Sequence, residues 1–340
     1  MTLLLCKLNR VTVVAILLAM AGFIQIASAM VVPHPLYKNP PHLKPSRPSE
    51  QFRPGSFDKS KSLPQKILVL RVQFTDVTFQ SSVVYPDSLV HDKAFFERWM
   101  LHLLDFFATA SRNEYIFEYD VPDQVYTLPN TMAYYGADTS TLSDARVPQM
   151  LQELIQMADN DVNYNEYDAI IVFHAGPGQE SDVGLSPNFN SLRPNTIWST
   201  FISRPDLQEA FDPENDNYPG ISTNDGKYIK EIVLMPESEF HDYFPGPDDE
   251  MGPYYLFSIY GVLCHQFGHQ IGLPTLFDNY SANGRSQGVG NWSLMGTGVW
   301  NNNGYNPAQL DAWCRYYLGW EQVQTITTDT ENLVADNFLS

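Results

Sequence analysis

The chain has 340 residues, with 20 basic and 39 acidic side chains, a net charge of −19 at pH 7 and three cysteines. Such a charge repels phosphate backbones, so we do not expect nucleic-acid binding. Three cysteines are too few for a disulfide-dense scaffold, although Cys264 and Cys314 could form one disulfide in an oxidising compartment. A buried free thiol is the equal alternative for Cys264, because it lies in an apolar stretch.

Residues 1–29 have the features of a secretory signal peptide. Lys7 and Arg10 precede an apolar run over residues 11–26, and Ala-Ser-Ala at 27–29 fits a cleavage site. The run is too short for a confident membrane span, and no later apolar segment is long enough. We therefore expect a secreted protein, extracellular or periplasmic, without a membrane span after cleavage. The alternative is an uncleaved membrane anchor.

Composition divides the rest of the chain into three parts. Residues 30–65 contain eight prolines and few apolar side chains, which is typical of a propeptide, arm or linker. Residues 66–320 have a globular composition and are long enough for one large domain or two closely packed subdomains. Residues 321–340 are expected to begin a C-terminal β-rich region or tail, and Ser340 need not be the true C-terminus.

Strand and helix patterns alternate along the globular part. Buried strands are predicted over residues 67–74, 169–173 and 229–235, and amphipathic helices over residues 92–109 and 147–158. We expect Asp92 near the start of the first helix and Pro148 in the first turn of the second. Residues 174–178 are predicted to form a turn. This alternation favours an α+β or α/β class, with a twisted sheet over helices.

A further helix, predicted over residues 254–272, carries the most specific pattern in the chain. His265 and His269 are four residues apart, so they lie on one helix face and can share one zinc ion. The apolar face of the helix would pack on the sheet. Gly272 lets the chain turn sharply at the helix end, and Pro274 prevents the helix from resuming.

Two positions depart from the HExxH pattern of zinc proteases. The glutamate that takes a proton from zinc-bound water is replaced by Gln266, whose amide is no proton acceptor near neutral pH. In the longer pattern with a third ligand, that ligand falls at Thr275, whose neutral hydroxyl is a poor zinc ligand. Losing a general base costs roughly 10²–10⁴-fold in rate. Two histidines alone should hold zinc weakly.

Other polar residues have two interpretations each. Asp278 could substitute as the third zinc ligand or could cap backbone N–H groups in its loop. His241 is a distant ligand candidate or a surface histidine, and His174 is expected in a turn outside the metal shell. The acidic clusters at residues 212–216 and 248–250 could hold calcium or could be solvated loops.

Residues 288–296 form a glycine-framed segment that contains Met295, and several short motifs accompany it. These are Tyr134-Tyr135-Gly136, Tyr167-Asp168, residues 174–178, Ile197-Trp198-Ser199 and the segment from Pro307 to Trp320. Together with the two-histidine helix, they resemble the immune inhibitor A family of secreted bacterial metallopeptidases in the metzincin group. The resemblance runs from about residue 67 to residue 320.

The resemblance implies an α+β, metzincin-like zinc-protease fold. In such a fold a twisted mixed sheet packs on helices, one helix carries the active site, and Met295 lies in a methionine turn beneath the metal. The resemblance also implies zinc-dependent endoproteolysis of protein or peptide substrates, export with a propeptide, calcium sites and C-terminal β-rich modules.

This sequence departs from the family, whose members usually read His-Glu-Phe-x-His followed by Gly-Leu-Pro-Asp. An Asp/Gly-rich stretch also commonly follows the Tyr-Asp pair, whereas Asp168 leads directly into a strand here. We therefore expect a catalytically impaired, secreted metallopeptidase-domain protein, a pseudoenzyme that binds proteins or peptides. Gln266 could be natural or engineered. The alternatives are an active zinc endopeptidase that uses Asp278 as an atypical third ligand and, less favoured, a structural adhesion module.

Overall fold

The computed structural model describes residues 62–81, 89–138, 144–180, 196–241, 255–277 and 288–322. The predicted signal peptide, most of the proline-rich segment, the acidic cluster at 248–250, Asp278 and residues 323–340 lie outside these ranges. Across the described ranges, the structure has no helix with the length and apolar character that a bilayer span requires.

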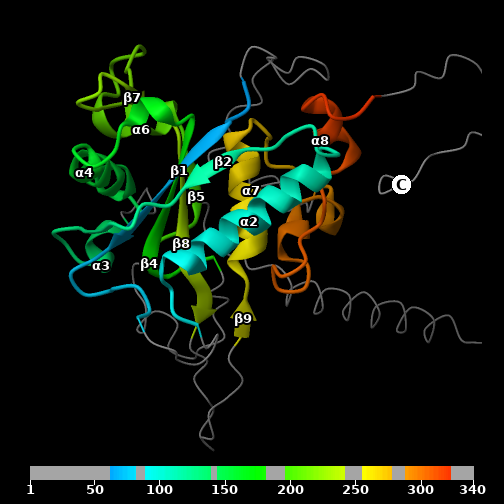
Figure 1. The fold of residues 1–340 in the computed structure, drawn as a ribbon, viewed down its shortest axis with the longest axis horizontal. Coiled ribbons are helices and arrows are strands. Elements are labelled where there is room, and N and C mark those ends of the chain that lie inside the picture. Colours follow the sequence, from blue (N-terminus) through cyan, green and yellow to red (C-terminus); the bar gives the residue numbers. More distant parts are fainter. Residues whose placement is uncertain are drawn as a thin grey trace, which may run out of the picture.

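A mixed, twisted sheet forms the centre of the described structure (Figure 1). Its main path is β2 (Glu118–Asp120), β1 (Lys66–Gln73), β4 (Ala169–Pro177), β8 (Ile232–His241) and β5 (Thr200–Ile202). On this path β2, β1, β4 and β8 run parallel, and β5 pairs antiparallel with β8.

Three shorter strand pairings complete the β-structure. β3 (Val125–Thr127) pairs parallel with β1, and β9 (Tyr255–Phe257) pairs antiparallel with β8. A separate two-stranded antiparallel ribbon consists of β6 (Ile221–Ser222) and β7 (Tyr228–Ile229).

Helices cover both faces of the sheet (Figure 1). α2 (Lys93–Ala110) and α7 (Ile259–Gln270) pack on one face, whereas α3 (Met132–Tyr135), α4 (Val147–Ala158) and α6 (Arg204–Phe211) pack on the other. Side chains of a strand alternate between faces, so Ile67 and Val69 join the α2 and α7 core while Leu68 and Leu70 join the α4 core. Burial on both faces explains why the strands read as continuous apolar runs.

The remaining elements are short. They are the 3₁₀ helices η2 (Tyr164–Glu166), η3 (Gly290–Trp292) and η4 (Thr297–Trp300), and the helix α8 (Ala312–Tyr317). The chain from η3 to α8 packs on the outer side of α7, so α7 lies between this segment and the sheet.

Three predicted elements are confirmed almost to the residue. The strand predicted over 67–74 is β1, and the helices predicted over 92–109 and 147–158 are α2 and α4. Asp92 caps α2, because its side chain accepts a hydrogen bond from the Phe95 N–H at 3.0 Å. Pro148 lies in the first turn of α4, where a missing N–H removes no helix hydrogen bond. The mixed sheet packed on helices is also confirmed.

The turn predicted at residues 174–178 is wrong, because β4 continues through His174 to Pro177. The neighbouring strand β8 also continues, so that His174 pairs with Pro236 and Pro177 pairs with Ser238. The register shifts between these two pairs. Gly176 lies inside the irregularity and has a φ of 89°, a conformation that favours glycine. The glycines and proline of this segment therefore mark an irregular strand.

Two other predicted boundaries are also wrong. The strand predicted over 229–235 begins at Ile232 and continues to His241, while Ile229 belongs to β7. The helix predicted over 254–272 begins at Ile259, because residues 255–257 pair with β8 as β9, and it ends at Gln270.

Both described cysteines are buried free thiols, so the alternative of a disulfide between Cys264 and Cys314 is not realised. Burial raises the pKa of both thiols, which keeps them protonated. In the acidic cluster at 212–216, Asp212 accepts a hydrogen bond from the Asn215 side chain at 2.9 Å. This local bond agrees with a solvated loop, and calcium binding there stays a prediction.

Candidate metal centre

Close packing on both sides fixes the position of α7. The Ser258 side chain caps the helix by accepting a hydrogen bond from the Tyr260 N–H at 3.1 Å. Farther along, Gly261 faces the segment that contains η4, and a β-carbon there would lie 2.0 Å from the Val299 carbonyl oxygen. α7 is therefore buried on nearly all sides.

The two predicted histidines meet on this helix. The Nε2 atoms of His265 and His269 are 3.2 Å apart. The His265 Nδ1 lies 2.8 Å from the Leu294 carbonyl oxygen, and the His269 Nδ1 lies 2.8 Å from the Leu273 carbonyl oxygen. Because a carbonyl oxygen can only accept, each Nδ1 carries the hydrogen and each Nε2 presents a lone pair. Burial lowers the pKa of His269, which favours its neutral form.

This arrangement fits two ligands of one zinc ion. Zn–N bonds of about 2.0–2.1 Å at a tetrahedral angle place two nitrogen ligands about 3.3–3.4 Å apart. Carbonyl partners on the Nδ1 atoms are the kind of contact that fixes the tautomer of metal-bound histidines. In the described part of the chain, no group of three or more His, Cys, Asp or Glu side chains is placed to hold a metal ion. The histidine pair therefore fits zinc as two of the three protein ligands of a catalytic site.

Gln266 faces the sheet edge formed by β5. Its side chain is 7% exposed, and its Nε2 donates a hydrogen bond to the Ser199 carbonyl oxygen at 3.3 Å. The ring of Phe201, a residue of β5, stacks on the ring of His269, with the two centroids 6.3 Å apart. The amide at position 266 therefore acts as a donor that ties α7 to the segment leading into β5.

Thr275 lies in a segment that passes both histidines. The Leu273 carbonyl contacts His269, and the Phe277 ring stacks on the His265 ring at a centroid distance of 6.3 Å. Between these contacts, the Leu276 N–H donates to the Met295 carbonyl oxygen at 2.8 Å. Half-buried Thr275 is thus flanked by residues that contact the two imidazoles.

Two other histidines are not near this pair in the described contacts. His174 is fully buried in β4, where burial lowers its pKa to about 4, so it is neutral and lies in a strand instead of the predicted turn. His91, which the sequence gave no reason to select, lies 2.6 Å from the Glu237 carboxylate in a buried pair. The side chain of His241 is outside the described structure.

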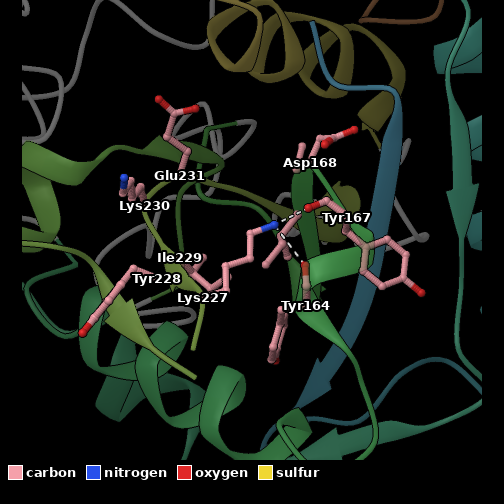
Figure 2. Close-up of a pocket in the computed structure, with 10 residues that line it drawn as sticks. Tyr164, Tyr167, Asp168, Lys227, Tyr228, Ile229, Lys230 and Glu231 are labelled. Carbon is pink, nitrogen blue, oxygen red and sulfur yellow. Dashed lines mark hydrogen bonds between the residues drawn. The ribbon is translucent and has the colours of Figure 1, made fainter. Parts of the chain in front are cut away.

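A separate cavity of about 430 Å³ opens where β4 and β8 begin (Figure 2). Lys227 extends across it, and its ammonium donates to the carbonyls of Tyr164 (2.9 Å) and Tyr167. Asp168 accepts the N–H groups that start β1, and Glu231 accepts from the Gln270 side chain at 3.0 Å. These three charged side chains hold parts of the fold together, so the cavity offers no ligand class of its own.

A helix that presents two imidazoles at zinc-ligand spacing, beside a mixed sheet with an antiparallel edge strand, defines a zinc-peptidase-like α+β domain. The catalytic-domain model of the immune inhibitor A peptidase M6 family matches residues 250–323, which include α7, Thr275 and Met295. This part of the chain is therefore similar to the catalytic domain of that family of metallopeptidases.

Two curated metalloproteases are similar to a larger part of the chain. Pre-pro-metalloprotease PrtV of Vibrio cholerae serotype O1 is 22% identical over 311 residues, which cover 77% of this chain and 30% of PrtV. Immune inhibitor A of Bacillus thuringiensis subsp. alesti is 25% identical over 203 residues, or 51% of this chain and 25% of that protein. The chain thus corresponds to less than a third of the length of these relatives.

Proposed function

We propose that the protein is an exported M6-type metallopeptidase domain that binds protein or peptide chains but has weak or no proteolytic activity. The observation that carries the proposal is the side chain of Gln266. It occupies the position of the general base beside His265, and its amide donates a hydrogen bond to the Ser199 carbonyl. Such a group cannot take a proton from a nucleophilic water near neutral pH.

Zinc would be held by the Nε2 atoms of His265 and His269, with Thr275 at the degenerate third-ligand position. When bound in such a site, zinc activates water and polarises a carbonyl group. The Leu294 and Leu273 carbonyls orient the two imidazoles, and the β5 edge would position an extended substrate. We further propose that Met295, buried against Gly268, forms the methionine turn of a metzincin fold.

Two features support impairment together. Position 266 lacks a proton acceptor, and a neutral hydroxyl at position 275 adds little to zinc affinity. The competing proposal is an active endopeptidase in which Asp278, three residues after Thr275, replaces the missing ligand. That residue lies outside the described structure, so only experiment separates the two proposals.

The test compares the unmodified chain with Gln266→Glu, Thr275→Asp and the double variant, in casein hydrolysis and in bound zinc. We expect the double variant to hydrolyse casein at least about 10²-fold faster, since a positioned base contributes roughly 10²–10⁴-fold. Adding His265→Ala to the double variant should abolish the gain and serves as the control. Robust zinc-dependent hydrolysis by the unmodified chain, lost in Asp278→Asn, would establish the competing proposal.

The wider organisation belongs to the same proposal. Residues 1–29 would be removed on export, residues 30–65 would form a propeptide or linker, and residues 66–320 would be the metallopeptidase domain. Residues 321–340 would begin a C-terminal region. N-terminal sequencing of the secreted protein checks the first boundary, since cleavage is expected after Ala29.

A further inference from the structure

The carbonyl group that orients His265 belongs to Leu294, and the backbone around Leu294 is held by two hydrogen bonds. The Leu294 N–H donates to the Gln309 carbonyl oxygen at 3.2 Å. The hydroxyl of Ser293 accepts the Met295 N–H, also at 3.2 Å. A serine hydroxyl that accepts from the N–H two residues later closes a small turn, and this turn encloses Leu294. The Ser293 side chain therefore helps to fix the direction of the Leu294 carbonyl.

The same hydroxyl connects the turn to α8. Ser293 is fully buried, and a side-chain hydrogen bond joins it to Cys314, which is also fully buried. The Cys314 thiol in turn donates to Asp311 Oδ2 at 3.3 Å. Asp311 Oδ1 caps α8 by accepting the N–H groups of Trp313 at 2.8 Å and Cys314 at 3.0 Å. A carboxylate at the start of α8 is thus linked to the turn through a thiol and a hydroxyl.

One assignment of the hydrogens satisfies this series of contacts. A carboxylate that caps a helix only accepts, so the thiol hydrogen of Cys314 points to Asp311. The Ser293 oxygen accepts the Met295 N–H, so the hydroxyl hydrogen is available for the Cys314 sulfur. Each group then donates to the next, from the Met295 N–H to the Asp311 carboxylate. Removing one member leaves its buried neighbours unpaired, which destabilises the arrangement.

The two imidazoles of the candidate metal centre differ in their dependence on this series. The Leu294 carbonyl, 2.8 Å from the His265 Nδ1, keeps the hydrogen on that nitrogen and leaves the Nε2 lone pair facing His269. The His269 Nδ1 contacts the Leu273 carbonyl instead, on a different segment. A change at Ser293 should therefore affect one imidazole and not the other.

We propose that Ser293 is a positioning residue of the candidate metal centre, held in place from α8 by Cys314 and Asp311. Ser293 acts through the Leu294 carbonyl, so its effect on a bound metal ion is indirect. The proposal gives a role to the segment 307–320, which the histidine helix does not contact through its ligands. It rests on the proposed function where it concerns zinc affinity, whereas the state of the imidazole is a property of the chain alone.

The first test determines the tautomer of His265 by NMR of the full chain with ¹⁵N-labelled histidines at pH 7.5. The shifts of the ring nitrogens distinguish the Nδ1–H form from the Nε2–H form, and His265→Ala identifies the signals. In the unmodified chain we expect the Nδ1–H form for His265 and His269. Ser293→Ala should give a mixture of both forms for His265 and leave His269 unchanged. A general loss of packing would change both histidines.

The second test measures zinc affinity by titration calorimetry. Ser293→Ala should weaken zinc binding about tenfold, because outer partners of metal-bound histidines contribute about 10–100-fold. Thr297→Val is the matched control, since it removes a buried hydrogen bond to Asn291 (2.7 Å) in the same segment but lies outside the series. This control should leave both the zinc affinity and the tautomer of His265 unchanged.

Two substitutions at Cys314 test the link to α8, and they decide the question even if Ser293→Ala does not fold. Cys314→Ser keeps a donor and an acceptor at the position, so the tautomer of His265 and the zinc affinity should stay as they are. Cys314→Ala breaks the series and should shift both in the same direction as Ser293→Ala. The shift should be smaller, because the bond between Ser293 and Met295 remains. Circular dichroism identifies variants that fail to fold.

Two results overturn the inference. The first is a folded Ser293→Ala variant in which His265 keeps only the Nδ1–H form. The second is an equal effect of Cys314→Ala and Cys314→Ser on the tautomer of His265. An unmodified chain that binds no zinc would count against the proposed function instead, because the tautomer measurement decides this inference without a metal ion.

Discussion

Gly268 lies directly against the sulfur of Met295: a β-carbon at position 268 would come within 2.6 Å of Met295 Sδ. The glycine stands between the two histidines of α7, and the residue before Met295 supplies the carbonyl that orients His265. The absence of a side chain at position 268 therefore allows α7 and the segment that contains Met295 to pack closely together.

We predict that Gly268→Ala destabilises the protein by about 1–2 kcal/mol. Overpacking a buried site costs about 1–3 kcal/mol, and the higher helix propensity of alanine returns up to about 1 kcal/mol. Urea unfolding of the single and double variants measures the effect. Met295→Val removes the atom that would clash, so in that background the same alanine should cost nothing. An equal cost in both backgrounds would show that Met295 is not the obstacle.

The periodic parts of the fold could be predicted because local pattern and burial agree there. The apolar stripe of α2 and its Asp92 cap appear in the sequence as they do in the structure. The strand at residues 255–257 could not be predicted in this way, since an apolar run before a helix gives no local sign that it pairs with β8. The same holds for residues 174–177, where Gly and Pro suggest a turn until the partner strand is known.

The candidate metal centre likewise has parts that the sequence predicts and parts that only the structure reveals. Histidine spacing on a helix is a local property, so His265 and His269 could be found from sequence. Their orienting partners are the backbone carbonyls of Leu294 and Leu273, which any residue type could supply.

The contact of Gln266 with β5 makes a prediction about the reverse substitution. Gln266→Glu at neutral pH replaces the amide donor with a carboxylate facing the Ser199 carbonyl, and Gln266→Met removes the donor while keeping the length. Both should destabilise by about 1–3 kcal/mol, the cost of leaving a buried acceptor unpaired. Denaturant unfolding at pH 7.5 gives the values. If Gln266→Glu is as stable as the unmodified chain, the hydrogen bond to Ser199 contributes nothing.

Glu237 provides a separate test of buried electrostatics. Its carboxylate accepts from His91 at 2.6 Å, from the Gly176 N–H at 2.7 Å and from the Gln80 N–H at 3.1 Å. In Glu237→Gln, one accepting oxygen becomes an NH₂ that faces other donors, so we expect a loss of about 3–5 kcal/mol. Asp123→Asn is the matched control, because its ion pair with Lys93 is on the surface and should matter little. Similar losses from both substitutions would refute this explanation.

His174 should make the protein less stable in mild acid. Burial lowers its pKa from 6.5 to about 4, so between these values the unfolded chain binds a proton that the folded chain does not. Stability therefore falls as pH drops below 6.5, by about 2 kcal/mol at pH 5 from this residue alone. His174→Asn keeps a donor for the Ala175 carbonyl but has no group that titrates in this range.

The free energy of unfolding at pH 7 and pH 5 measures this contribution. The variant should lose some stability at pH 7 through poorer packing, yet its additional loss at pH 5 should be about 2 kcal/mol smaller than that of the unmodified chain. If His174→Asn keeps the full acid sensitivity of the unmodified chain, other groups cause that sensitivity. His91, which pairs with Glu237, would then be the next residue to replace.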